Sequence, residues 1–206
     1  MNQTQAGHGT DEAKSKRQQI LKAAYDVFSR KGYYRATVDE IIALADTGKG
    51  TVYNYFTNKE QLFCTLVQER GEPFAIALAD TISSELLPME KFKKIIKLIL
   101  VLYIEDADLW RVLIHEVRGL GEDNHSNLSQ ETVMKYQDGF QHIIDNVEAV
   151  LKEGVDKAVF RPMNTTHVAY CLFSIILTMV YQKFIEDDIE ITVHNIAEFV
   201  LRGITT

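Results

Sequence analysis

Polar and aromatic side chains alternate in the segment K-G-T-V-Y-N-Y-F, which begins at Lys49. Lys49 and Tyr53 are i, i+4 neighbours on one helix face, and Thr51 and Tyr55 form a second such pair. A lysine ammonium can donate to guanine O6 or N7, and hydroxyl groups suit phosphate oxygens. Gly50 would let the backbone approach a base edge closely. This segment therefore indicates a helix that contacts DNA.

A second short helix and a turn must position this segment. Thr37 followed by Glu40 is a capping box, which starts a helix. That helix has an apolar face at i, i+3, i+4 and i+7, made of Val38, Ile41, Ile42 and Ala45. The run Asp46-Thr47-Gly48 supplies turn chemistry, and Gly is an adequate N-cap for the next helix. Val52 and Phe56 anchor that next helix on one side only. The pattern predicts a helix-turn-helix, whose second helix enters the DNA major groove.

Two longer runs resemble the signature of the TetR (tetracycline-repressor-like) family of bacterial transcriptional regulators. K-G-T-V-Y-N-Y-F-x-N-K-E-x-L, which ends at Leu62, is similar to the family's recognition helix and the start of the following helix. I-L-x-A-A-x-x-V-F-x-x-K-G-Y-Y-x-A-T-V-D-E-I, which begins at Ile20, is similar to its first helix and the entry to its second. The resemblance covers residues 16–64. Family members usually have Gly-Val-Ser where this chain has Asp46-Thr47-Gly48.

The resemblance implies an all-α fold with about nine helices. We expect residues 1–12 to be a disordered arm and residues 13–58 to form a three-helix DNA-binding domain that contains the helix-turn-helix. We expect residues 59–206 to form a helical domain for effector binding and dimerisation. Apolar periodicity along the chain predicts the same number of helices, with the first at residues 14–31 and the fourth starting at Asn58.

The predicted DNA-binding residues lie in and around the helix-turn-helix. They are Thr37, Gly48, Lys49, Gly50, Thr51, Tyr53, Asn54, Tyr55 and Lys59. The resemblance implies that Lys49, Gly50 and Tyr53 read bases. It implies that the two threonines, Tyr55 and Lys59 contact the DNA backbone. The alternative for the tyrosines is that they are core aromatics.

The charge of the chain differs between its two ends. The 206 residues carry a net charge of −7, which by itself argues against nucleic-acid binding. Residues 1–60, however, hold nine Lys and Arg against seven Asp and Glu, whereas residues 61–206 hold thirteen against twenty-two. The N-terminal end is therefore mildly basic and the remainder acidic. This balance suits a dimer that reads one operator better than a protein that coats DNA regardless of sequence.

Two C-terminal segments are the predicted homodimer interface. Thr165–Ile185 is apolar nearly all round, so a helix there would be buried on two sides. Thr192–Arg202 has an apolar stripe that includes Phe199. By resemblance, they fit a four-helix bundle made from two helices of each subunit. The alternative is that Thr165–Ile185 is a wholly internal core helix.

An effector pocket is the family's expectation for the C-terminal domain. The candidate lining residues are Trp110, His115, Tyr136, Phe140 and Phe173. Their neighbours indicate a mainly apolar cavity with a few polar groups. The alternative is that these aromatic side chains only fill the core. His115 and Glu116 with His142 do not have the spacing of a metal site, since no His pair lies at i, i+4.

Enzyme classes find little support in the sequence. It contains no G-x-S-x-G elbow, no Walker A run and no H-E-x-x-H motif. Cys64 and Cys171 each sit among apolar residues, which do not favour a reactive thiolate. We expect no cofactor and no metal. The most apolar run, at residues 168–181, is shorter than the roughly 20 residues of a membrane helix, and no secretion signal opens the chain, so a soluble cytoplasmic protein is expected.

The sequence thus predicts a dimeric, ligand-responsive DNA-binding transcriptional regulator that is not an enzyme. We expect a repressor that binds a palindromic double-stranded operator and is released from it by a small, largely apolar effector. The alternative is a constitutive architectural DNA-binding dimer with no effector. In the ligand-responsive repressor, a tilt of the fourth helix would link the effector domain to the DNA-binding domain. The architectural dimer would have no such tilt.

Overall fold

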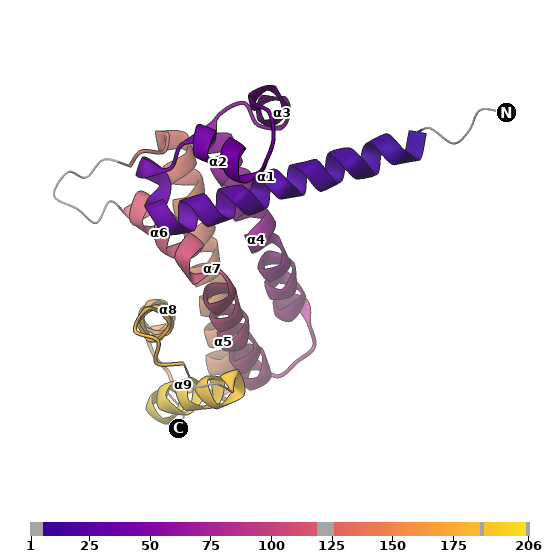
Figure 1. Cartoon of the computed structure of the whole chain (residues 1–206). Coiled ribbons are helices and arrows are strands. Elements are labelled where there is room, and N and C mark those ends of the chain that lie inside the picture. The colour runs from indigo at the N-terminus through magenta and orange to yellow at the C-terminus, as the bar shows by residue number, and fades with distance from the viewer. Residues whose placement is uncertain (1–5, 119–125, 186–187, 205–206) are drawn as a thin grey trace. The chain divides into compact units, whose positions relative to one another are not determined.

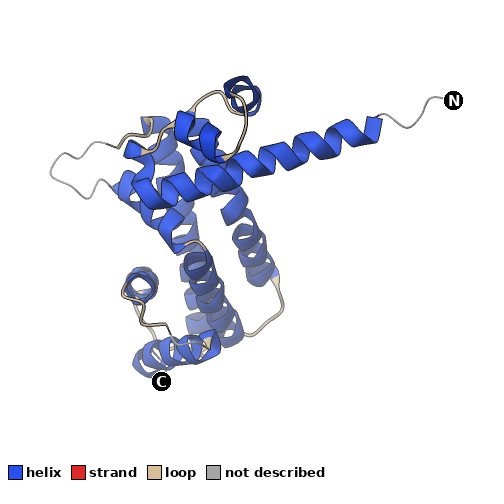
Figure 2. Cartoon of the chain, in the orientation of Figure 1, coloured by secondary structure: helices blue, strands red, loops and turns tan. Residues whose placement is uncertain are grey.

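The computed structural model describes residues 6–118, 126–185 and 188–204, and its regular structure in these ranges is entirely helical (Figure 1, Figure 2). The helices are α1 (Ala6–Arg35), α2 (Val38–Leu44), α3 (Lys49–Tyr55), α4 (Lys59–Ser83), α5 (Pro88–Glu105), α6 (Ala107–Arg118), α7 (Gln130–Asp156), α8 (Thr165–Tyr181) and α9 (Ile189–Ile204). The prediction of an all-α fold with about nine helices is confirmed for the described residues.

Two compact units divide the chain. The N-terminal unit contains Met1–Arg70 and Asp108–Ser129, and the C-terminal unit contains Gly71–Ala107 and Gln130–Thr206. Helix α4 therefore contributes its first turns to one unit and the rest to the other. Nearly all of α6 belongs to the same unit as the helix-turn-helix.

Aromatic rings form the centre of the N-terminal unit. Phe28 on α1 meets Phe63 on α4 edge-on, with ring centroids 5.1 Å apart, and Tyr33 lies 5.0 Å from Phe63. Ile41 of α2 and Val52 of α3 are also buried. Helices α1, α2 and α3 contact one another pairwise, so the three helices share one core.

Helix α1 begins earlier than predicted and is interrupted close to its predicted C-terminal end. It begins at Ala6, so residues 6–12 of the predicted disordered arm are helical, and residues 1–5 lie outside the described residues. At its C-terminal end Gly32 has φ 75° and ψ 170°, which interrupts the helix near the predicted end. Glycine tolerates this conformation because it has no Cβ. The bend directs Tyr33–Arg35 toward α2.

Helix α5 is the centre of the C-terminal unit, where it contacts α7, α8 and α9. Helix α7 also contacts α8. One close approach depends on a glycine, because a Cβ at Gly154 would stand 2.1 Å from Cδ2 of Phe160. The Phe160 ring is buried and meets Phe92 of α5 at 6.0 Å. Gly154 therefore lets this ring fill the space between α7 and α5.

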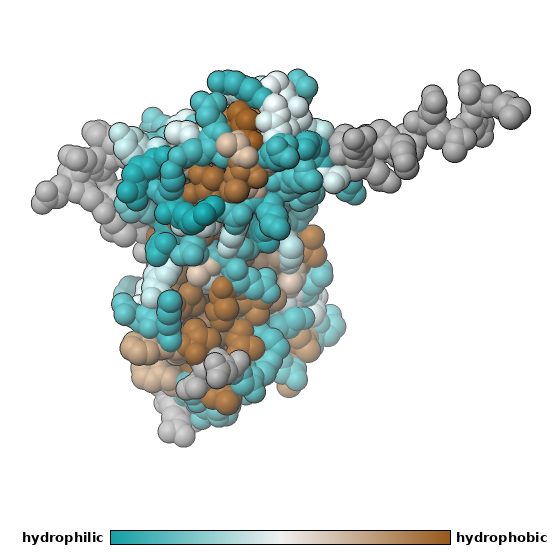
Figure 3. Space-filling view, in the orientation of Figure 1, coloured by the Kyte–Doolittle hydropathy of each residue, from teal (hydrophilic) through white to brown (hydrophobic). Residues whose placement is uncertain are grey.

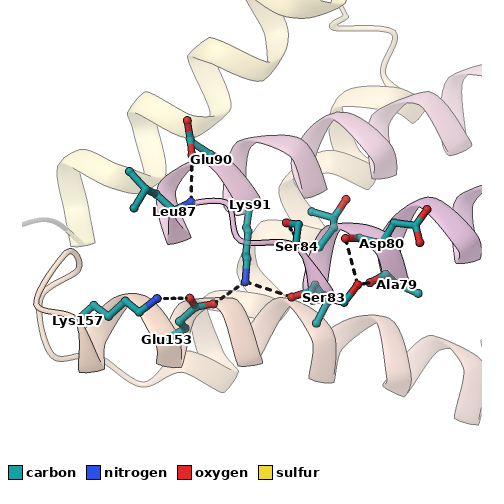
Figure 4. Close-up of polar contacts among 11 residues, drawn as sticks. Ala79, Asp80, Ser83, Ser84, Leu87, Glu90, Lys91, Glu153 and Lys157 are labelled. Carbon is teal, nitrogen blue, oxygen red and sulfur yellow. Dashed lines mark hydrogen bonds and ion pairs between the residues drawn. The ribbon is translucent and has the colours of Figure 1, made fainter.

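A buried lysine fastens the end of α4 within this unit (Figure 4). Lys91 Nζ donates to the backbone oxygen of Ile82 and to Oε2 of Glu153, both at 3.1 Å. Lys157 also pairs with Glu153, at 2.6 Å. The bonds from Lys157 and then Lys91 hold the pKa of Glu153 below its ordinary value. One ammonium thus joins the last turn of α4 to α5 and α7.

Candidate nucleic-acid interface

The first turn of α2 carries the predicted capping box. Thr37 Oγ1 accepts from the Glu40 N–H at 3.3 Å, and the Thr37 N–H donates to Glu40 Oε2 at 3.2 Å. Lys31 forms an ion pair with the same glutamate. This pair and the cap hydrogen bonds lower the pKa of Glu40. Helix α2 therefore starts at a defined residue, which positions the turn that follows it.

The turn between α2 and α3 contains a residue in the left-handed region. Asp46 has φ 44°, a conformation that favours glycine and that Asp tolerates better than most residues. The resemblance to the TetR family implies glycine at this position, and the left-handed turn suits either residue. Lys16 Nζ donates to the Asp46 backbone oxygen at 3.3 Å. Gly48 is the N-cap of α3, with φ −81° and ψ 150°.

Helix α3 has one anchored face and one open face. Val52 and Phe56 are almost completely buried, as predicted. Lys49, Gly50, Tyr53 and Asn54 are exposed, whereas Thr51 and Tyr55 are half-buried. A Cβ at Gly50 would meet nothing within 4 Å, so the backbone there is open to an approaching ligand. This is the arrangement that a helix needs in order to enter the major groove.

An acidic side chain also belongs to this open surface. Lys49 Nζ lies 3.3 Å from Asp39 Oδ1 on α2, and 66% and 77% of the two side chains are exposed. Sequence reasoning missed Asp39 as a member of the surface, because the turn brings together residues from two different helices. The Lys49 ammonium therefore has an internal partner when DNA is absent.

Lys59 has a structural role that the sequence did not reveal. Its Nζ donates to the backbone oxygens of Tyr33 at 2.9 Å, Ala36 at 3.1 Å and Tyr34 at 3.4 Å. It also lies 4.4 Å from the centre of the Tyr33 ring. Burial lowers the pKa of Lys59. The ammonium thus binds carbonyl groups that follow the Gly32 bend, and its contact with a DNA phosphate stays a prediction.

Two glutamates hold the segment before α7 within the N-terminal unit. Glu60 Oε1 accepts from the backbone N–H of Ser129 at 3.2 Å and from its hydroxyl at 2.5 Å. Glu116 on α6 is buried and accepts from the Asn127 N–H at 2.9 Å. Glu60 is the second residue of α4, so the start of α4 is hydrogen-bonded to the segment that precedes α7. No local sequence pattern signals these bonds.

The predicted effector residues lie on three helices. Trp110 is buried on α6, whereas the His115 side chain on the same helix is 72% exposed. Tyr136 and Phe140 are half-buried on α7, and Phe173 is buried on α8. The structure brings Phe140 and Phe173 together edge-on at 4.6 Å. The rings of Tyr103 and Tyr170 extend this pair into an aromatic cluster within the C-terminal unit.

A shallow depression of about 810 Å³ lies along the outer face of α7. It is lined by Gln130, Glu131, Met134, Lys135, Asp138, Gly139 and His142. None of the five predicted effector residues lines it. Among the residues that the structure describes, no helix is long and apolar enough to cross a membrane.

Fold and surface together define a helix-turn-helix DNA-binding regulator. Residues 20–65 match the family of bacterial regulatory proteins called the tetR family, and residues 85–182 match a tetracyclin repressor-like C-terminal domain. The chain belongs to the TetR family of transcriptional regulators. The first match contains the entire helix-turn-helix, including α3, whose exposed face the sequence predicts to contact DNA.

Two similar proteins carry the name of fatty acid metabolism regulators, and a third similar structure contains stearoyl-CoA. The fatty acid metabolism regulator protein of Bacillus subtilis (strain 168) is 28% identical over 159 residues, which cover 74% of this chain and 79% of that protein. The structure of a Clostridium perfringens protein classed with fatty acid metabolism regulators has a TM-score of 0.74 and 27% identity, covering 91% of this chain and 99% of that one. The regulator FadR from Bacillus subtilis, solved in complex with stearoyl-CoA, shares the fold with a TM-score of 0.68 and 22% identity, covering 90% of this chain and 98% of that one.

Proposed function

We propose that the protein is a homodimeric repressor that leaves a palindromic operator when its C-terminal unit binds a fatty acyl compound. The observation that carries the proposal is the geometry of α3. Val52 and Phe56 fasten this helix on one side, and Lys49, Gly50 and Tyr53 stand open on the other. An ammonium donor, an uncovered backbone and an exposed aromatic hydroxyl suit base edges in the major groove.

Contacts to the DNA backbone would come from the rim of this surface. Thr37, Thr51, Tyr55 and Lys59 carry hydroxyl or ammonium groups suited to phosphate oxygens. Thr51 and Tyr55 are half-buried, so packing restricts their side chains before DNA arrives. Asn54 is exposed on α3 and completes the set. Such contacts position the helix, whereas sequence preference comes from its base-reading residues.

The exposed face of α8 supports a dimer. It carries Tyr170, Cys171, Ser174, Thr178 and Tyr181 at helical spacing. Three of these five side chains are small, which lets a second helix approach closely. Phe199 of α9 is 72% exposed and adds apolar area. Figure 3 shows further hydrophobic side chains on the visible surface of the C-terminal unit. Two copies related by a two-fold axis would each place one α3 in a half-site.

The effector class follows from the aromatic cluster and from the relatives. Phe140, Phe173, Tyr103 and Tyr170 gather within the C-terminal unit, where a separation of α7 from α8 would expose an apolar space. An acyl chain suits such a lining, because nearly all of its surface is apolar. Two relatives with 27–28% identity are fatty acid metabolism regulators by name. A long-chain acyl thioester is therefore the favoured effector.

Helix α4 would couple the effector to the DNA. Leu62 and Phe63 bury its first turns in the N-terminal unit, and Lys59 fastens it to the end of α1. Lys91 fastens its last turn in the C-terminal unit. A tilt of α4 would then turn the recognition helix with it. An effector that prefers the DNA-free state by about 1–3 kcal/mol would release DNA measurably.

Three ligands separate the possible effectors. Stearoyl-CoA, stearate and free coenzyme A are each added to the protein, and melting temperature and operator release are measured together. We expect stearoyl-CoA to raise the melting temperature and release the operator. Phe140→Trp, which adds ring volume to the aromatic cluster, should weaken both effects. Lys94→Ala, at an exposed position of α5 that lines neither the aromatic cluster nor the depression, serves as the control. If ligands stabilise the protein without releasing DNA, or if none binds, the constitutive architectural alternative gains support.

A further inference from the structure

We infer that Asp39 is a specificity-determining residue of the DNA surface, and that it reads cytosine beside a guanine contact of Lys49. This inference rests on the proposed DNA-binding function. It begins with the contact between the two helices of the helix-turn-helix. Lys49 Nζ and Asp39 Oδ1 lie 3.3 Å apart, and both side chains are mostly exposed. The open face of the recognition helix therefore contains an acceptor as well as donors.

Two adjacent acids at the start of α2 have different roles. Glu40 is held by the capping box and by Lys31, so its carboxylate serves the structure of the N-terminal unit. Asp39 has neither of these contacts, and Lys49 is its ion-pair partner. The first turn of a helix favours an acidic side chain, but Glu40 already supplies one. Helix formation alone therefore does not account for the second carboxylate.

A carboxylate on this surface has a cost. DNA affinity depends largely on cations that neutralise phosphates, so a fixed negative charge at the contact surface weakens binding to every sequence. Asp39 also occupies the ammonium that would otherwise attract phosphates. An acidic group at this place is useful only if the base sequence can compensate for it. Cytosine N4, an amino donor in the major groove, provides that compensation.

The pair has the spacing of base readout. Lysine donates to guanine O6 and N7, and aspartate accepts from cytosine N4. The two groups lie 3.3 Å apart on the exposed surface, so they reach the same short stretch of a groove. The two side chains can therefore address one G·C pair or two neighbouring ones. Away from such a pair, Lys49 stays neutralised by Asp39, and binding to other sequences is reduced.

The test uses the full chain and selected DNA. Preferred duplexes are selected from a randomised pool with the wild type, with Asp39→Asn and with Asp39→Glu. We expect the wild type to select a G·C pair in each half-site. Asp39→Glu should select the same pair. Asp39→Asn should change cytosine to adenine at that position, because Asn pairs with adenine N6 and N7. Affinity for a scrambled duplex should rise for Asp39→Asn, and the ratio of specific to non-specific affinity should fall roughly tenfold.

Controls keep the outcomes distinct. Glu85→Gln removes an exposed negative charge from the C-terminal unit and should leave the selected sequence and the affinity ratio unchanged. If Asp39→Asn strengthens binding to both duplexes equally and selects the wild-type sequence, Asp39 contributes charge alone and the inference is overturned. If the wild type itself selects no sequence, the operator-binding function is overturned first.

Discussion

At the scale of single residues, the proposed DNA contacts of α3 predict that operator affinity depends on a few side chains. We expect Lys49→Ala and Tyr53→Ala each to weaken operator binding by about 1–3 kcal/mol, with relaxed base preference for Lys49→Ala. Removing the ammonium also leaves Asp39 unneutralised near the phosphates. Titration of the operator and a scrambled duplex at several salt concentrations measures both effects. Lys94→Ala, on an exposed position of α5, is the control. An equal loss on both duplexes would contradict base reading by Lys49.

Lys59 is expected to act on stability as well as on DNA. Lys59→Ala removes the donor for three backbone carbonyls, so the free energy of unfolding should fall by roughly 1–3 kcal/mol. If Lys59 also contacts a DNA phosphate, the loss of that contact in Lys59→Ala would weaken binding to all sequences and reduce the salt dependence. Urea unfolding and salt-dependent titration separate the two roles. Lys22→Ala on the exposed side of α1 is the matched control. Wild-type stability in Lys59→Ala would show that the carbonyl contacts matter little.

At the scale of elements, the turn between α2 and α3 depends on one backbone conformation. Asp46 has φ 44°, where a Cβ is unfavourable. We expect Asp46→Ala to lower the free energy of unfolding by about 1 kcal/mol, and Asp46→Gly to keep it. Chemical denaturation compares the two variants, with Asp138→Ala on α7 as a helical control. If Gly and Ala give the same loss, the Asp46 side chain, not φ, determines the stability of the turn.

The junction of α4, α5 and α7 should make stability depend on pH. Because the folded protein lowers the pKa of Glu153, its carboxylate stabilises the fold above the unfolded pKa of about 4.3. That contribution is lost as the pH falls through the lower folded pKa. Glu153→Gln should therefore be less stable than the wild type at pH 7, and the difference should shrink below about pH 4. Unfolding at several pH values measures this.

An exposed ion pair provides the comparison for that experiment. Lys97 and Glu190 join α5 to α9, but both side chains are about half exposed. Exposed pairs contribute little to stability, so Glu190→Gln should behave like the wild type across the same pH range. Lys91, in contrast, is buried and would lose a charged partner in Glu153→Gln. Identical behaviour of the two variants would mean that the buried lysine does not depend on Glu153.

At the scale of the whole molecule, the proposed dimer would place two α3 helices on one operator. Light scattering at micromolar concentration should report twice the chain mass of 23.5 kDa. Ser174→Arg places a charge on the exposed face of α8 and should yield monomers that lose operator binding, because each copy makes half of the contacts. Met134→Arg on α7 is the control. A wild-type monomer, or a Ser174→Arg dimer, would contradict this interface.

The sequence by itself determined the helices of the helix-turn-helix and the family. The capping box at Thr37, the apolar period of α2 and the anchors Val52 and Phe56 act within a few residues of one another, so each leaves a pattern that can be read locally. The all-α fold follows from the same periodicity. Exact helix ends were less predictable, since α1 and α9 extend beyond their apolar stripes and α8 stops at Tyr181, before the predicted Ile185.

Only the tertiary structure decided which distant groups meet. Lys59 reaches the carbonyl of Tyr33 across 26 positions, Lys91 meets Glu153 across 62, and Glu60 meets Ser129 across 69. Such contacts carry no period in the sequence, because they depend on the packing of helices and not on the repeat of any one of them. The pairing of Asp39 with Lys49 likewise depends on the angle between α2 and α3. The physical reason is that hydrogen bonds between helices are set by three-dimensional distance, which local pattern does not encode.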